Sequence, residues 1–143
     1  MSMKDFHNEF KMNIAKAVNT ITDNTAGVSE IIDAKGFSSQ EWLVYVGTLS
    51  DADTVVTVQL YEGDASDMSD ESAVASGDII GVSAPTFEFD DDGEAIKFGY
   101  RGTKRYTRCK FTPANNTGNI PYGMLCLQGH PDAKPETTNA SEP

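Results

Sequence analysis

The side chains that could do chemistry fall into three groups, of which the first is acidic. Residues 90–94 read Asp-Asp-Asp-Gly-Glu, and an earlier segment carries Asp64, Asp67 and Asp70. Calcium binds where several carboxylates converge. Residues 90–94 lack both the alternating Asp-x-Asp-x-Asp-Gly pattern and the bidentate glutamate of a calcium loop. We therefore expect both acidic segments to be solvated turns, with calcium binding as the alternative for each.

Histidine and cysteine form the second group, and they are scarce. His7 lies near the start of the chain and His130 precedes a proline, so neither belongs to a metal-ligand pair. The sequence has no Gly-x-Ser-x-Gly elbow and no phosphate loop. Cys109 and Cys126 lie in predicted strands, where we expect small buried side chains; a disulfide would need these strands to be neighbours in register. We expect no enzyme activity, no cofactor and no metal.

The third group is basic, although the chain as a whole is acidic. The sequence has 11 Lys and Arg against 22 Asp and Glu, for a net charge of −11. Five of the basic residues lie within ten positions: Arg101, Lys104, Arg105, Arg108 and Lys110. Clustered cations bind carboxylates. We predict that these five residues contact a partner or an identical neighbour, the alternative being that they pair with the protein's own acidic loops.

Composition narrows the class of protein and of partner. At 143 residues the chain is long enough for one domain with its own core. Its acidity argues against direct nucleic-acid binding, which needs a basic stripe. No apolar run is long enough to span a bilayer, so no membrane contact is expected. The N-terminal residues do not resemble a signal peptide, so we expect synthesis in the cytoplasm.

The elements that position these groups are predicted to be strands. Apolar and polar residues alternate in short runs with turn signals between them, which is typical of an antiparallel β-sandwich or jelly roll. We expect an all-β, jelly-roll-like antiparallel β-sandwich of about eight strands. The predicted runs are residues 16–22, 28–32, 41–49, 54–62, 78–82, 86–89, 96–100, a run that ends at 111, and 120–128.

Two of these runs carry specific expectations. The run 41–49 is apolar on both faces, which predicts that it is buried on both sides or covered by a partner. The glycine-containing link 101–104 predicts a hairpin between its flanking strands. The run around Leu125 and Leu127 is the most apolar and is expected to lie centrally in the sheet. A helical turn is expected at residues 69–75.

Both ends of the chain differ from the body. Residues 1–14 are predicted to form an N-terminal arm, either a short amphipathic helix or a segment that orders on a partner, with Phe6 and Phe10 as its contact residues. The alternative is a frayed terminus. The sandwich domain is expected over residues 15–131. Residues 132–143 are rich in Pro, Thr, Glu and Ala and are predicted to be a flexible tail, the alternative being a segment extended over a neighbour.

Five segments resemble small proteins of tailed-phage head modules, which are encoded beside the major capsid protein. The resemblance covers residues 15–132 and leaves out the arm and the tail. It implies a head decoration, or cement, protein with a jelly-roll-like sandwich on the capsid exterior, bound to the major capsid protein; it carries over no catalytic residues. We also expect a homo-oligomer on the capsid, because an acidic body with one basic strand suits side-by-side association. The segments are IDAKGF at 32–37, LVYVGTL at 43–49, TVQLYEGD at 57–64, GYRGTKRYTR at 99–108 and LQGHP at 127–131.

Two other functions remain open from the sequence. A jelly-roll module that binds carbohydrate would stack sugar rings on exposed aromatic side chains, for which Trp42, Tyr45 and Tyr61 are the candidates. A head–tail connector or another tail-associated virion protein would use a similar sandwich at a different place in the particle.

Overall fold

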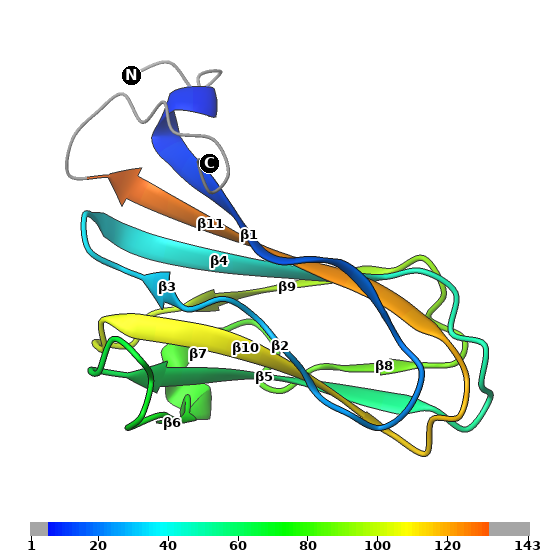
Figure 1. The fold of residues 1–143 in the computed structure, drawn as a ribbon. Helices are drawn as coiled ribbons and strands as arrows, with labels where there is room; N and C mark the ends of the chain where they lie inside the picture. Colours follow the sequence, from blue (N-terminus) through cyan, green and yellow to red (C-terminus); the bar gives the residue numbers. More distant parts are fainter. Residues whose placement is uncertain (1–5, 132–143) are drawn as a thin grey trace.

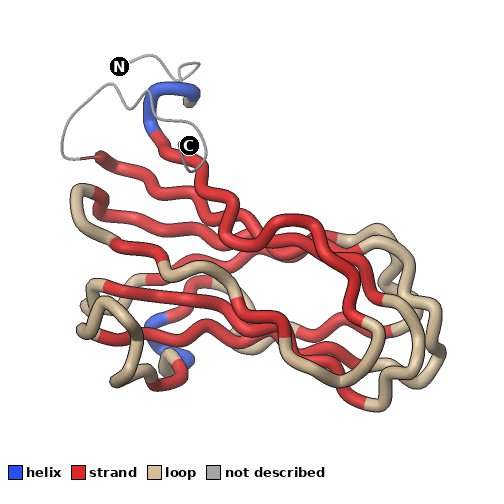
Figure 2. The backbone as a smooth tube through the Cα atoms, in the orientation of Figure 1, coloured by secondary structure: helices blue, strands red, loops and turns tan. Residues whose placement is uncertain are grey.

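The computed structural model describes residues 6–131, which form two β-sheets packed face to face (Figure 1). Strands make up most of this part of the chain and loops join them at the two ends of the sandwich (Figure 2). The elements are η1 (His7–Glu9), β1 (Phe10–Ile21), β2 (Gly27–Val28), β3 (Ile32–Asp33), β4 (Phe37–Val46), β5 (Val55–Gly63), β6 (Ser72–Ala73), η2 (Ser76–Asp78), β7 (Ile79–Ile80), β8 (Thr86–Glu88), β9 (Ala95–Tyr100), β10 (Tyr106–Ala114) and β11 (Ile120–Pro131).

The order of the strands is that of a jelly roll. One sheet runs β1-β11-β4-β9-β7, and the other runs β2-β10-β5-β6 with β3 on β10 and β8 on β5. We count β2 and β3 as one interrupted strand, and β6 and β8 as another. β7 is then an additional strand at the edge of the first sheet. The remaining eight strands then have the order first, eighth, third, sixth in one sheet and second, seventh, fourth, fifth in the other. The predicted all-β, jelly-roll-like sandwich is confirmed.

The core lies between the two sheets and follows the alternation of each strand. Trp42 and Val44 of β4 are fully buried, as are Cys109 and Phe111 of β10. The rings of Phe111 and Tyr122 stack across the sheets with centroids 4.2 Å apart. Removing such apolar surface from water is the main stabilising contribution to folding.

Both cysteines belong to this core, as predicted. Cys109 and Cys126 are free thiols on strands of different sheets. Burial raises the pKa of each thiol well above its ordinary value. Both side chains therefore behave as small hydrophobic groups.

The predicted hairpin at 101–104 is wrong. β9 pairs with β4 and β7 in one sheet, whereas β10 pairs with β5 in the other, so the link crosses between the sheets. Alternation shows which face of a strand is buried, but it is the same for a hairpin and for a crossing between sheets. The expectation for the most apolar run is confirmed, because β11 lies between β1 and β4.

The structure also corrects the N-terminal arm. Residues 10–14 belong to β1 and pair with β11 in the register Phe10 to Gly129 and Ile14 to Leu125. The predicted helix is limited to the single turn η1, because backbone pairing with β11 prevails over the spacing of four between Phe6 and Phe10. Residues 1–5 of the arm, and the tail at 132–143, lie outside the described residues.

The helical turn expected at 69–75 is not formed; its residues include the short strand β6, which pairs with β5. Within residues 6–131, no helix has the length and apolar character needed to cross a bilayer.

Candidate functional site

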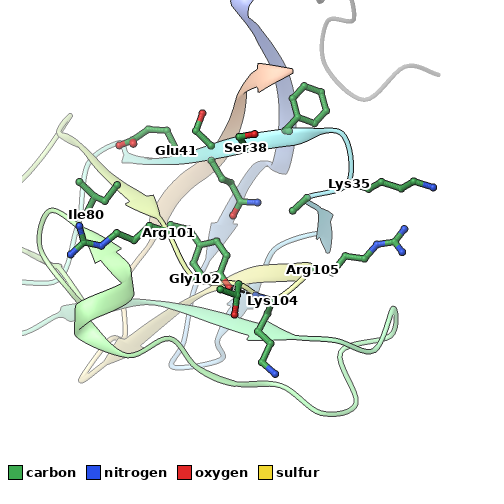
Figure 3. Close-up of a pocket in the computed structure, with 14 residues that line it drawn as sticks. Lys35, Ser38, Glu41, Ile80, Arg101, Gly102, Lys104 and Arg105 are labelled. Atoms are coloured by element: carbon green, nitrogen blue, oxygen red, sulfur yellow. Dashed lines mark hydrogen bonds between the residues drawn. The ribbon is translucent and has the colours of Figure 1, made fainter. Parts of the chain in front are cut away.

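The structure divides the basic cluster into two groups. Arg101, Lys104 and Arg105 lie on the link from β9 to β10, beside a cleft of about 550 Å³ that opens between this link and the start of β4 (Figure 3). Arg108 and Lys110 lie farther along, on the outward face of β10. All five lie within ten residues of the sequence; three are on the link between the sheets and two are on the outward face of β10.

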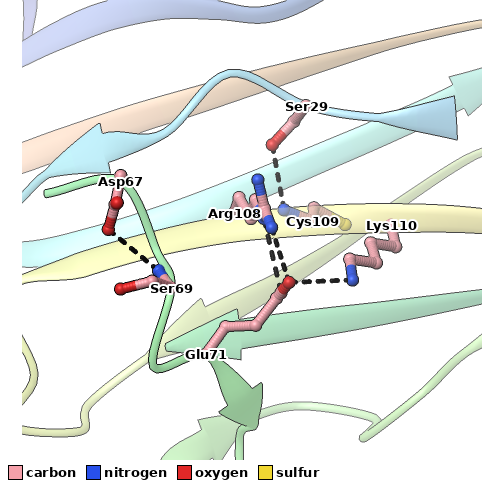
Figure 4. A network of polar contacts seen from close by, with 7 residues as sticks. All are labelled: Ser29, Asp67, Ser69, Glu71, Arg108, Cys109 and Lys110. Atoms are coloured by element: carbon pink, nitrogen blue, oxygen red, sulfur yellow. Dashed lines mark hydrogen bonds and ion pairs between the residues drawn. The ribbon is translucent and has the colours of Figure 1, made fainter. Parts of the chain in front are cut away.

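One glutamate pairs with both cations of the outward pair (Figure 4). Arg108 donates to Glu71 through Nε and Nη2, and Lys110 Nζ donates to the same carboxylate at 3.1 Å. Lys110 also lies 4.3 Å from the centre of the Tyr61 ring. The Arg108 guanidinium holds the pKa of Glu71 below its ordinary value. This half of the cluster is therefore bound to the protein's own loop.

Two of the three link residues are also paired within the chain. Lys104 Nζ donates to Asp64 at 2.7 Å, and Arg105 makes a two-pronged contact with Asp33 at 2.8 and 2.9 Å. Arg101 Nε donates to the Gly77 carbonyl at 3.0 Å, and within residues 6–131 its side chain joins no ion pair.

Pairing with the protein's own acidic groups, the alternative weighed from the sequence, thus describes four of the five basic residues. Their role as contacts with a partner stays a prediction.

The carboxylates of the acidic loop after β5 bind backbone amides. Asp70 accepts hydrogen bonds from the amides of Asp64 and Ala65, and Asp67 accepts one from Ser69. These backbone donors lower the pKa of both Asp70 and Asp67. The carboxylates therefore fix the shape of the loop.

The turn at 90–94 is held in the same way. Asp92 accepts from the amide of Leu49 at 2.8 Å, and Asp91 accepts from the amide of Glu88 at 2.7 Å. Among residues 6–131, no three His, Cys, Asp or Glu side chains are grouped so that they could hold a metal ion. Both acidic segments act as turn-forming elements in this structure.

The outward face of the five-stranded sheet is apolar, and we call it the apolar face. Cross-strand register aligns Ile14 with Leu125 and Leu43 in one row, and Met12 with Leu127 in the next. The side chain of Ile14 is 44% exposed. The apolar face consists of Phe6, Phe10, Met12, Ile14, Leu43, Tyr45, Ile80, Leu125 and Leu127.

A shallow groove of about 580 Å³ runs along this face. Phe6 and Phe10 stack at its end with ring centroids 4.5 Å apart, and Leu43 and Leu127 lie along it. Phe6 is 63% exposed. Apolar surface of this kind is typical of interaction sites and ligand-binding grooves. The sequence signal for it was the run 41–49 with two apolar faces; β1 and β11 supply the rest.

Charged side chains also line the groove on this face, namely Glu9, Glu41 and Lys97. Glu41 is opposite Leu127 on the neighbouring strand, and its carboxylate is half-buried. Burial raises the pKa of Glu41, and the charge of Lys97 opposes that rise. The groove is therefore lined by apolar side chains together with side chains of both charges.

The aromatic residues proposed for sugar stacking do not form a platform. Trp42 is fully buried and its Nε1 donates to Gln40 at 2.8 Å, so its exposure was predicted wrongly. Tyr45 packs over Gly123, where an added Cβ would collide with its ring. Tyr61 lies on the outward face of the other sheet, against Lys110. Three rings in three different environments cannot stack on one ligand.

The structure also brings together one pair that the sequence did not indicate. The Ser39 hydroxyl and His130 Nδ1 are 2.9 Å apart, on adjacent strands β4 and β11. The two residues are 91 positions apart in the sequence, so no local motif could have shown the contact. His130 has a positive φ of 50°, and the hydrogen bond holds this strained end of β11 against β4.

Comparisons with known proteins identify the fold. No protein-family model and no curated protein matches the chain. A solved structure of infectious bursal disease virus, Gx strain, is similar with a TM-score of 0.52 and 9% identity, over 90% of this chain and 34% of that one. The chain thus spans about a third of the length of that protein. At this identity the similarity shows the fold alone.

Two further structures are similar at lower TM-scores. The Gt strain of the same virus gives 0.42 at 9% identity, over 88% of this chain and 34% of that one. The Clostridium thermocellum xylanase 10B, CBM22-1 and GH10 modules complexed with xylohexaose, gives 0.43 at 9% identity, over 89% of this chain and 28% of that one. These TM-scores are too low to add to the comparison.

Proposed function

We propose that this protein is a decoration, or cement, protein of a tailed-phage head, which binds the outside of the shell and bridges neighbouring subunits of the major capsid protein. The observation that carries the proposal is the apolar face, a contiguous outward surface that no described element of the chain covers. The jelly-roll fold and the resemblance to phage head-module proteins agree with it. The role is adhesive, without catalysis or a cofactor.

The mechanism is the burial of surface. A standard protein interface removes about 1,600 Å² from water, and many copies on one shell add up to a large resistance to internal pressure. If the apolar face fits only the expanded lattice, binding stabilises that lattice by its difference in affinity for the two states. The groove between Phe6 and Leu43 would receive an apolar side chain of the capsid protein.

The distribution of charge suits this arrangement. The net charge of −11 keeps free copies soluble and apart. The opposite sheet presents Arg108, Lys110 and Glu71 as a polar, self-paired surface, which would face solvent or a second copy on the shell. The apolar face would bind the shell, and the opposite sheet would lie away from it.

Rebinding tests the proposal. Purified heads that lack this protein are mixed with increasing amounts of it and sedimented, and the bound copies are counted. We expect saturation at a fixed number of copies per capsid subunit. Absence of binding would refute the proposal, and image reconstruction with density only at the tail would replace it with the tail-associated alternative.

A further inference from the structure

The cleft beside the link between β9 and β10 has features of a peptide-binding site. β4 pairs with β11 from Phe37 onward, but its pairing with β9 begins only at Gln40. Residues 37–39 therefore have no β9 neighbour, and all three line the cleft. Within the described residues, the start of β4 is therefore an open strand edge at the cleft.

The backbone N–H and C=O groups of Ser38 at this edge face the β9 side of β4, where the cleft lies. The amide of Val46, on the same strand, donates to the Glu94 carbonyl on the β9 side. Backbone groups alternate between the two sides of a strand, so those of Ser38, eight residues earlier, also face the β9 side. An extended segment lying in the cleft could pair with both the N–H and the C=O of Ser38.

A buried amide adds a donor at the same place. Gln40 is only 6% exposed, and its Oε1 accepts from Trp42 Nε1 and from Thr107 Oγ, each at 2.8 Å. Because the tryptophan nitrogen can only donate, the orientation of the amide is settled. Its Nε2 is buried and has no hydrogen-bond partner within residues 6–131. A buried donor without an acceptor is costly, so an incoming oxygen is favoured here.

The basic side chains around the cleft favour an acidic segment over a neutral or basic one. Lys35, Arg101, Lys104 and Arg105 line the cleft, with Glu41 as the single carboxylate. In Figure 3 Lys35 and Arg105 extend from one side and Arg101 from the other. Lys104 and Arg105 already pair with Asp64 and Asp33, whereas Lys35 and Arg101 join no ion pair within the described residues. The unpaired cations lie on opposite rims.

We propose that this cleft binds an extended acidic peptide segment of a partner protein, which pairs with the edge of β4 at Ser38, accepts a hydrogen bond from Gln40 Nε2 and places carboxylates near Lys35 and Arg101. Strand addition of this kind takes its affinity from backbone hydrogen bonds and its selectivity from side chains. The cleft volume of about 550 Å³ lies within the range of ligand sites. The proposal does not rest on head binding, since isolated protein suffices to test it.

The test uses a labelled, blocked peptide, Thr-Glu-Val-Glu-Thr, and fluorescence anisotropy. We expect saturable binding to the wild-type protein. The double variant Lys35→Gln, Arg101→Gln should bind about tenfold more weakly. The matched double variant Lys11→Gln, Lys16→Gln, which changes the net charge equally on β1, should bind as wild type. A peptide with Gln in place of Glu should also bind about tenfold more weakly.

Two further measurements separate strand pairing from charge attraction. Two peptides are compared, one N-methylated at its odd-numbered backbone nitrogens and one at its even-numbered backbone nitrogens. One of the two should lose binding and the other should keep it, because only alternate residues face β4. The side-chain amide resonances of Gln40 should shift on binding. The proposal is overturned if no binding is seen at millimolar peptide, or if both methylated peptides bind equally. It is also overturned if the Gln40 resonances do not move, or if an acidic oligosaccharide binds more tightly than the peptide.

Discussion

At the scale of residues, Glu71 is the ionic centre of the polar sheet. It receives Arg108 and Lys110 from β10, and all three side chains are between 20% and 26% exposed. Because this triad is partly shielded from water, it contributes more than a surface ion pair does. It also joins the loop after β5 to the sheet.

We predict that Glu71→Gln lowers the free energy of unfolding by roughly 1–2 kcal/mol at neutral pH. The substitution keeps the shape of the side chain but removes the charge that Arg108 and Lys110 share. Urea unfolding measures the change. Asp53→Asn, an equal change of charge at an exposed turn, serves as the control. Equal losses in the two variants would show that the triad has no special role.

The same carboxylate should make stability depend on pH. The pKa of Glu71 is lowered by Arg108, and that of Asp33 by Arg105. A lowered pKa in the folded state means that this stabilisation is present above the ordinary carboxyl pKa and is lost as pH falls through the lowered value. We therefore expect wild-type stability to decline in acid, and Glu71→Gln to decline less. Parallel curves from pH 7 to pH 2 would contradict this assignment.

At the scale of elements, alternation predicted the faces of strands better than it predicted their neighbours. The run 41–49 was predicted to have two apolar faces, and Trp42 and Val44 lie together on its buried face, because a period of two follows from the pleat itself. The sequence could not show that β9 and β10 belong to different sheets, since a link as short as 101–104 suits both a hairpin and a crossing between sheets. The start of β1 at Phe10 was hidden because its inward residues, Asn13 and Ala15, are polar or small.

The first residues of the chain illustrate the consequence. Deleting residues 1–14 would remove the pairs from Phe10 to Ile14 with β11, so it would damage the sheet as well as any contact surface. A single substitution separates these effects. We predict that Phe6→Ala leaves the free energy of unfolding within about 0.5 kcal/mol of wild type, because Phe6 is 63% exposed, while head binding weakens. Unchanged occupancy on heads would exclude Phe6 as a contact.

At the scale of the whole molecule, stability comes from the core between the sheets. Phe111 is fully buried between Phe87 and Tyr122, with ring centroids 6.2 and 4.2 Å away. We predict that Phe111→Ala lowers the free energy of unfolding by about 3–5 kcal/mol, through lost burial and the cavity left behind. Thermal and urea unfolding measure it. A loss below about 1 kcal/mol would mean that the sheets do not pack through this residue.

The candidate site was only partly accessible from the sequence. The five basic residues were found, but the carboxylates that pair with four of them, Asp33, Asp64 and Glu71, lie 37 to 72 positions away, and only the fold brings them together. The apolar face was indicated by one strand and is completed by β1 and β11, which the register aligns. Contacts that depend on which strands are neighbours cannot be deduced from a local pattern.

The two outward faces differ, and this difference is the basis of the proposed function. Leu127 lies within the apolar face, and Thr57 is exposed on the outward face of the other sheet. Leu127→Lys and Thr57→Lys add the same charge to opposite sides of the sandwich. Far-UV circular dichroism and urea unfolding confirm that both variants are folded before they are used.

The occupancy of these two variants on heads that lack the protein is the most direct measurement. If the apolar face is the contact surface, Thr57→Lys should reach the wild-type copy number on heads. Leu127→Lys should bind more than about tenfold more weakly. Wild-type binding by Leu127→Lys, or an equal loss in Thr57→Lys, would contradict it.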